Sequence, residues 1–206
     1  MANMRLVASS LPSMGDCTND TFTITGADPV SMKNMPTNLC GILTGQHLYV
    51  SVKTVSSVKV TVNLASIGSQ KYNILIRQYD SSQTDYLAPR GCLQYFRNDV
   101  GTISTFNNQA GMGELLNNHM YSACIAQNDA YCDINLTANN FELTGSSGMC
   151  SNTVTFGLGQ QCGPTFGVSS SLIWNYTGPY MIPMISNSDN SAMVGGYEIS
   201  FILLPC

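Results

Sequence analysis

The eight cysteines are the side chains whose type and spacing most clearly indicate chemistry in this sequence. Cys17 and Cys40 flank a polar, Thr-rich run, Cys150 and Cys162 flank a similar one, and a glycine follows the second cysteine of each pair. An even set of cysteines without a CxxC spacing predicts a disulfide framework formed in an oxidising compartment. We therefore expect two equivalent disulfides, Cys17–Cys40 and Cys150–Cys162, and no redox chemistry.

Four cysteines remain outside these pairs. Cys124 and Cys132 lie at the end and the start of neighbouring predicted strands, eight residues apart, so they can face each other across a hairpin. Cys92 and Cys206 would then join the beginning of the later part of the chain to its end. The sequence thus predicts Cys124–Cys132 and Cys92–Cys206, each stabilising the fold by about 2–4 kcal/mol through restriction of the unfolded chain.

Residues for catalysis are sparse. Nucleophilic catalysis needs a nucleophile, a base and an orienting group within reach of one another. The two histidines, His47 and His119, fall in different parts of the chain, and we expect both to be surface or hydrogen-bonded structural side chains. The acidic residues show no pairing suited to glycoside hydrolysis, and no phosphate-binding loop or metalloprotease motif occurs. We predict that the protein is not an enzyme and needs no cofactor.

The elements that must position these cysteines are strands. Short runs with β-branched residues or alternating polarity, punctuated by Gly, Asn and Ser, predict an all-β sandwich or barrel. In residues 58–62 the apolar side chains alternate, as one buried strand face requires. Residues 112–120 are the only short helical candidate. The predicted strands are residues 4–8, 21–25, 47–52, 59–64, 72–78, 101–106, 120–126, 132–138, 152–156, 172–176, 180–185 and 197–203.

The same succession of patterns surrounds both cysteine pairs. Residues 3–9 match 133–139 ahead of each pair, and residues 72–76 match 197–201 after it. A repeat of this kind indicates one structural unit used twice. The copies are unequal, because only the later one has a long stretch before its pair. We predict three regions: 1–79 as the C-terminal half of a domain, 80–91 as a linker, and 92–206 as a complete domain.

Composition indicates a protein from outside the cell. Charged residues make up 10% of the chain and apolar residues 44%. Three N-x-S/T sequons, at Asn19, Asn135 and Asn175, predict N-linked glycans, and together with the cysteines they predict secretion. Residues 1–16 do not resemble a cleavable signal peptide, so we expect a processed or partial chain. A net charge of −4 argues against nucleic acid, and no apolar run is long enough to span a membrane.

Several motifs of the later part resemble the CUB family. The runs are Gly101-Thr-Ile-Ser-Thr-Phe-Asn107, Tyr121-Ser-Ala-Cys-Ile125 and Ile134-Asn-Leu-Thr-Ala-Asn-Asn-Phe-Glu-Leu143, with Asn187-Ser-Asp-Asn-Ser191 and Gly196-Tyr-Glu-Ile-Ser-Phe201 near the end. Residues 91–96 and the ending Leu204-Pro-Cys206 resemble the secreted tandem CUB-like proteins of arthropods. The resemblance implies a jelly-roll β-sandwich. It also leaves a second pairing open, Cys92–Cys124 with Cys132–Cys206, because the family's first disulfide has that form.

The resemblance also makes calcium binding a function to consider. Many CUB domains hold calcium through a Glu, an Asp three residues after the third cysteine, and the Asp of an S-D-x-S motif. Asp189 matches the last position, but Thr153 replaces the middle Asp. In the first copy Asp20 matches the middle position, and Ser66 stands near the last. Calcium prefers six or more oxygen ligands with several carboxylates, so we predict no tight site.

The truncated first copy suggests a function. Five strands in residues 1–79 cannot close a two-sheet sandwich, so an apolar face and strand edges need a cover. The complete domain of the same chain, a neighbouring copy or a missing upstream half could supply it. We predict a protein-interaction module that binds protein partners or copies of itself, as an oligomer or filament. The alternatives are an accessory region of an extracellular protease and a glycan-binding module.

Overall fold

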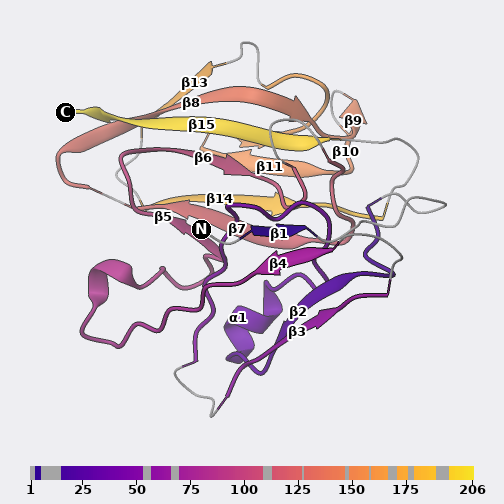
Figure 1. Ribbon diagram of the computed structural model, residues 1–206. Coiled ribbons are helices and arrows are strands. Elements are labelled where there is room, and N and C mark those ends of the chain that lie inside the picture. The colour runs from indigo at the N-terminus through magenta and orange to yellow at the C-terminus, as the bar shows by residue number, and fades with distance from the viewer. Residues whose placement is uncertain are drawn as a thin grey trace.

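The computed structural model describes residues 3–5, 15–52, 57–65, 70–108, 113–126, 128–146, 149–157, 159–166, 171–175, 179–188 and 195–206. Nearly all regular structure in these residues is β-strand (Figure 1). The predicted all-β sandwich is confirmed.

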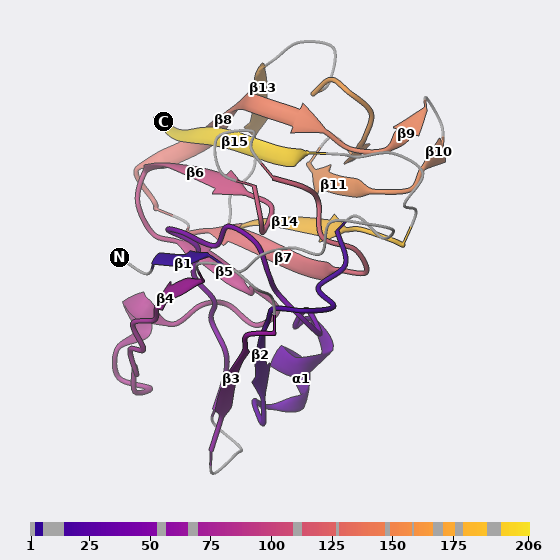
Figure 2. The same ribbon diagram turned by 45° about the vertical axis from the view of Figure 1, so that its right-hand side comes forward.

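Two facing sheets build the later part of the chain (Figures 1 and 2). The five-stranded sheet has the order β12 (Gly159–Gln161), β11 (Thr153–Phe156), β14 (Tyr180–Ile185), β7 (Met120–Ile125) and β5 (Gln94–Phe96). The four-stranded sheet has the order β13 (Ser171–Asn175), β8 (Tyr131–Glu142), β15 (Gly196–Pro205) and β6 (Val100–Ser104). A short pair, β9 (Gly145–Ser146) and β10 (Met149–Cys150), extends beyond them.

Alternating side chains fill the space between these sheets. Ile134 and Leu136 of β8 and Phe201 of β15 are buried, as are Ile182 and Met184 of β14. Because successive strand residues point to opposite faces, the residues between them lie on the outer faces. Alternation of buried apolar and outward-facing side chains along β8, β14 and β15 therefore builds this core.

The earlier part of the chain lies below the five-stranded sheet in Figure 1. It contains two antiparallel pairs, β1 (Asn3–Arg5) with β4 (Lys71–Asn73) and β2 (Thr21–Thr25) with β3 (Lys59–Asn63). Helix α1 (Pro29–Lys33) lies beside β2, and the 3-10 helix η1 (Thr84–Tyr86) falls within residues 80–91. Only Tyr72 and Asn73 of the predicted strand 72–78 pair, and residues 47–52 form no strand.

The predicted helix at 112–120 is wrong. Residues 113–119 contain turns instead, and Asn118 has a φ of 57°, in the left-handed region that interrupts a helix. The α-helix begins at Pro29, where Asp28 caps it. The Asp28 carboxylate accepts hydrogen bonds from the N–H groups of Val30 (2.9 Å) and Ser31 (3.2 Å). An Asp–Pro pair is a typical helix start, and this signal was missed.

Four disulfides use all eight cysteines. Cys17–Cys40 and Cys150–Cys162 are present, as the repeat predicts. The other two are Cys92–Cys124 and Cys132–Cys206, the pairing that the family resemblance had left open.

The prediction of Cys124–Cys132 and Cys92–Cys206 is therefore wrong, for a topological reason. Strand β7, which contains Cys124, and strand β8, which contains Cys132, are not a hairpin, since they belong to opposite sheets. Cys92 instead precedes β5, the parallel neighbour of β7, and Cys206 follows β15, the neighbour of β8.

The strands around the two equivalent disulfides have a similar order. β2 pairs with β3 on one side and, through the Phe22–Leu39 bridge, with the residues before Cys40 on the other. β11 pairs with β14 and with β12, which ends just before Cys162. The runs 3–5 and 133–135 also both pair with a later strand, although their registers differ.

Candidate functional site

The earlier and later parts meet along an internal interface. We define it by residues 15–17 and 37–51 on one side and residues 93–96, 104–107 and 114–119 on the other. The second side includes the edge strands β5 and β6, one from each sheet. Gln46 and His47 contact both strands, so this segment closes one open side of the sandwich.

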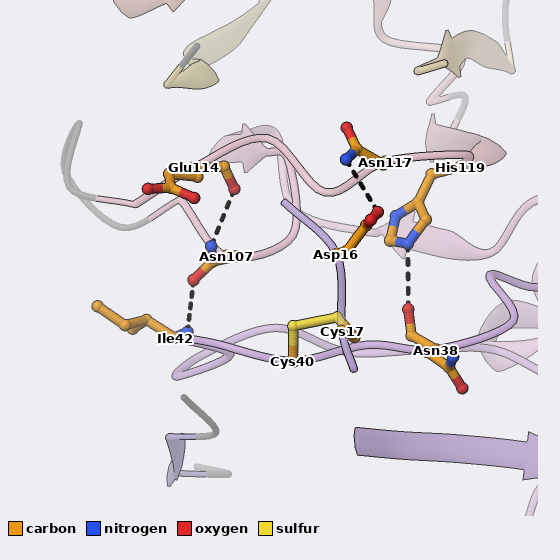
Figure 3. Close-up of a disulfide and its surroundings, with 9 residues drawn as sticks. All are labelled: Asp16, Cys17, Asn38, Cys40, Ile42, Asn107, Glu114, Asn117 and His119. Atoms are coloured by element: carbon orange, nitrogen blue, oxygen red, sulfur yellow. Dashed lines mark hydrogen bonds between the residues drawn. A yellow bond between two sulfur atoms is a disulfide. The ribbon is translucent and has the colours of Figure 1, made fainter. Parts of the chain in front are cut away.

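One end of the interface surrounds the Cys17–Cys40 disulfide (Figure 3). The Asn107 Oδ1 accepts a hydrogen bond from the Ile42 N–H (2.8 Å), and its Nδ2 donates to the Glu114 carbonyl oxygen (2.9 Å). Asn107 itself has a φ of 63°. A Cβ at Gly41 would overlap this amide, so only glycine permits the contact.

The same end carries further polar contacts between the two parts. The Asn117 Nδ2 donates to the Asp16 Oδ1 (2.9 Å), and the Asn117 N–H donates to the Gly15 carbonyl oxygen (3.0 Å). A pocket of about 200 Å³ opens here, and its lining includes Asp16, Asn38 and His119. With one carboxylate it can bind a small polar group through hydrogen bonds, but it does not resemble a calcium cage.

His119 is part of this interface rather than of a catalytic group. Its Nε2 lies 3.1 Å from the Asn38 carbonyl oxygen, which can only accept, so Nε2 carries a proton. Its ring is edge-on to Phe106 (6.3 Å between centroids) and Tyr121 (6.4 Å). Burial lowers the pKa of His119 to about 4, although the hydrogen bond to Asn38 partly offsets this. His119 is therefore neutral at pH 7.

The other end of the interface is built around Gln46 and His47. The Gln46 Nε2 donates to the Ser104 Oγ (2.7 Å), and its Oε1 accepts from the Gln94 Nε2. Since Gln94 lies in β5 and Ser104 in β6, Gln46 links the two sheets. The His47 Nε2 lies 3.1 Å from both the N and the O of Tyr95 and bonds to one of them, depending on its tautomer. Burial lowers the pKa of His47.

Apolar packing continues across the interface. Phe22, Ile24, Leu39 and Leu43 belong to the same buried cluster as the core of the sandwich. The backbone adds a hydrogen bond of 2.7 Å from the Tyr49 N–H to the Leu93 carbonyl oxygen. The apolar face of the earlier part is therefore covered here by the later part of the same chain, which is one of the three possibilities that the sequence left open.

The two acidic residues considered for calcium differ in what the structure describes. Asp20 is fully buried, and its carboxylate accepts hydrogen bonds from the Ala65 N–H (2.8 Å) and the Gln70 Nε2 (3.2 Å). Asp189 lies outside the described residues. Where the structure is described, no group of three or more His, Cys, Asp or Glu side chains could hold a metal ion.

The three sequon asparagines lie at different places. Asn19 precedes β2 and is exposed, and Asn175 is exposed in β13. Asn135 lies in β8, a central strand, and is half-buried. Glycosylation at all three stays a prediction.

An exposed apolar segment follows β4 in the earlier part. Leu75 is 58% exposed and Ile76 69%, and Tyr72 within the strand is also exposed. Beyond them, Tyr79 stacks on Tyr86 with ring centroids 5.1 Å apart, and the Arg97 guanidinium lies 3.8 Å from the centroid of the Tyr86 ring. Residues 80–91 are therefore tied to the later part.

Comparison with known proteins supports the CUB resemblance for the later part. A family model of the animal CUB domain matches residues 89–161, which is less than half of the chain. No curated protein sequence matches. The described residues include no helix long and apolar enough to cross a membrane.

Solved structures of low sequence identity are also similar. The CUB1-EGF-CUB2 domains of rat MASP-1 are 12% identical at a TM-score of 0.42, and the comparison covers 98% of this chain and 86% of that one. The corresponding region of human MASP-1/3 is 13% identical at a TM-score of 0.40, and that comparison covers 98% of this chain and 88% of that one. The full extracellular region of zebrafish Gpr126/Adgrg6 is 20% identical at a TM-score of 0.42, with 56% of this chain but only 15% of that chain covered. Residues 89–161 are thus similar to an animal CUB domain.

Proposed function

We propose that this chain is an extracellular, non-catalytic protein-binding module whose partner is a second copy of the same chain. The match of residues 89–161 to the animal CUB domain supports the class, because CUB domains generally act as interaction modules. Four disulfides fit an extracellular location.

The choice of a second copy as the partner rests on the exposed apolar segment that follows β4. In the later part, β15 lies between two strands, β8 and β6. Its counterpart β4 pairs only with β1 among the described residues, and the apolar Leu75 and Ile76 follow it into solvent. An extended apolar segment beside a free strand edge favours strand addition. Pairing of residues 72–76 with the same residues of another copy gives a closed dimer, whereas pairing with a different surface would give a filament.

The test is the mass of the full chain by light scattering over a range of concentrations. We expect a monomer–dimer equilibrium, shifted to monomer in Ile76→Asp because a buried charge in the contact is unfavourable. Ile185→Asp is the matched control: this isoleucine is 42% exposed, but in the five-stranded sheet, and its variant should dimerise like the parent chain. A monomer at every concentration would contradict self-association, and a mass that keeps growing would contradict the closed dimer.

A further inference from the structure

The outer face of the four-stranded sheet carries an unusual arrangement. Ile134 and Leu136 of β8 are fully buried in the core. Because strand residues alternate between faces, Asn135 and Thr137 must lie on the outer face. Asn135 is thus on the surface side of a central strand, half-buried by its neighbours.

Strand register places three exposed apolar side chains around Asn135. Asn135 pairs with Ile173 of β13 on one side and with Ile202 of β15 on the other, and Ile202 pairs with Val100 of β6. These three side chains are 60%, 49% and 57% exposed, respectively. Directly opposed side chains lie about 5 Å apart, so the four residues form one continuous row across the sheet. Contiguous exposed apolar side chains usually mark a surface that something covers.

The next row along the sheet is polar. Thr137 pairs with Ser200, and Ser200 pairs with Thr102, so three hydroxyl residues lie beside the apolar row. Asn139 extends this polar region, since its Nδ2 donates to the Ser200 Oγ (2.9 Å). The face therefore offers an apolar line next to a line of hydroxyl groups. A carbohydrate has matching surfaces, because its C–H faces are apolar and its edges carry hydroxyl groups.

Asn135, Leu136 and Thr137 form a sequon at the centre of this row. We propose that an N-linked glycan attached to Asn135 lies on this sheet face and covers Ile173, Ile202 and Val100. The sugar C–H groups contact the apolar row, and the sugar hydroxyls reach Thr102 and Ser200. A second sequon asparagine, Asn175, is exposed on the same face of β13, in register with Asp133. The inference rests on the proposed extracellular location.

Attachment requires a lipid-linked oligosaccharide diphosphate as the donor and the transferase of the secretory pathway. The Asn135 Nδ2 forms a bond to the anomeric carbon of the sugar and loses one proton. The bond from that carbon to the diphosphate oxygen breaks, and the lipid diphosphate leaves with the electron pair. The modified amide keeps its carbonyl oxygen and one N–H, so it can still form hydrogen bonds on the sheet surface.

A glycan at Asn135 would leave only part of the molecular surface open to protein partners. A bulky, hydrated glycan on the four-stranded sheet keeps other proteins from docking there. Protein contacts are then confined to other surfaces, such as residues 72–76.

The experiment uses the full chain secreted from cultured animal cells. Mass spectrometry of its peptides gives the glycan occupancy of Asn19, Asn135 and Asn175 separately. Hydroxyl-radical footprinting then measures the exposure of Ile173, Ile202 and Val100, before and after enzymatic removal of the glycans from the folded protein. Thr137→Val removes only the Asn135 sequon, and Thr137→Ser keeps it as the matched control.

We expect Asn135 to be occupied in the parent chain and in Thr137→Ser. Labelling of the three apolar residues should rise severalfold in Thr137→Val or after glycan removal, while Ile185 on the other sheet stays unchanged. The proposal is overturned if Asn135 is bare while another sequon is occupied, or if labelling does not change. Three bare sequons in the secreted chain would overturn it as well, whereas a chain that the cells retain would contradict the proposed extracellular location instead.

Discussion

At the scale of single residues, the internal interface depends on a glycine. Gly41 has a φ of 81°, and a Cβ there would overlap the Asn107 side chain. Gly45 has a similar φ of 78°, but a Cβ there would meet nothing within 4 Å. We predict that Gly45→Ala lowers the free energy of unfolding by about 1–2 kcal/mol from backbone strain alone. Gly41→Ala should cost about 1–3 kcal/mol more, because it adds a steric overlap. Denaturant unfolding of both variants measures the difference, and equal losses would contradict this contact.

His119 makes stability depend on pH. Its folded pKa of about 4 lies below the ordinary value of 6.5, so the unfolded chain binds a proton more readily than the folded one. The stabilisation is complete above pH 6.5 and is lost as the pH falls from 6.5 towards 4, by about 3 kcal/mol in total. Chemical denaturation between pH 4 and 7 should show this slope, and His119→Gln should flatten it. A slope that is unchanged in His119→Gln would show that other groups cause it.

Both histidines illustrate what residue types alone can predict. Their separation in the sequence argued against catalysis and for a structural role, and each bonds to a backbone group of the other part of the chain. Which backbone group they contact was not predictable, because Asn38 and Tyr95 are far away in sequence. Asn107 and Gln46 were missed for the same reason, since their partners Ile42 and Ser104 are also far away in sequence.

At the scale of elements, Gln46 is the link between the edge strands β5 and β6. Gln94 is fully buried, and the Gln46 Oε1 accepts from its Nε2. We predict that Gln46→Leu lowers the free energy of unfolding by about 1–3 kcal/mol, because it leaves this buried donor unpaired. The double variant Gln46→Leu/Gln94→Leu should recover part of that loss, since it removes both polar partners. A double-mutant cycle by denaturant unfolding measures the coupling, and strictly additive losses would contradict it.

Strands were predictable where alternation and turn residues were both clear. Residues 21–25 and 180–185 match β2 and β14 in full. Residues 47–52 have strand-like composition, but of their contacts with residues 93–95 one uses the His47 side chain and one the Tyr49 backbone, so no regular ladder forms. The pairing of Cys124 failed because a short connection was read as a hairpin, whereas the chain crosses between sheets there. Local patterns specify a strand but not its neighbours.

At the scale of the whole molecule, the sequence left open what buries the apolar face of the earlier part. The sequence predicted that a half-domain needs a cover, but it could not choose among the same chain, a second copy and a missing segment. The choice depends on shape, because residues 37–51 fit against β5 and β6 through close approach at Gly41 and the side chain of Gln46. Such complementarity has no periodic signature in a sequence.

If the two parts share one core, they should unfold as one unit. The Ile42 N–H donates to the Asn107 Oδ1 and the Tyr49 N–H to the Leu93 carbonyl oxygen, so both amides lie across the internal interface. We predict that in native-state hydrogen exchange both exchange as slowly as the Leu143 amide, which bonds to Gly163 within the sandwich. The exposed Ser82 amide, bonded only to the nearby Asp80, is the fast-exchanging control. Because one buried cluster contains Leu39, Leu43 and the sandwich core, opening the interface exposes the core itself. Exchange at Ile42 and Tyr49 that is much faster than at Leu143 would show that residues 15–51 detach while the sandwich stays folded.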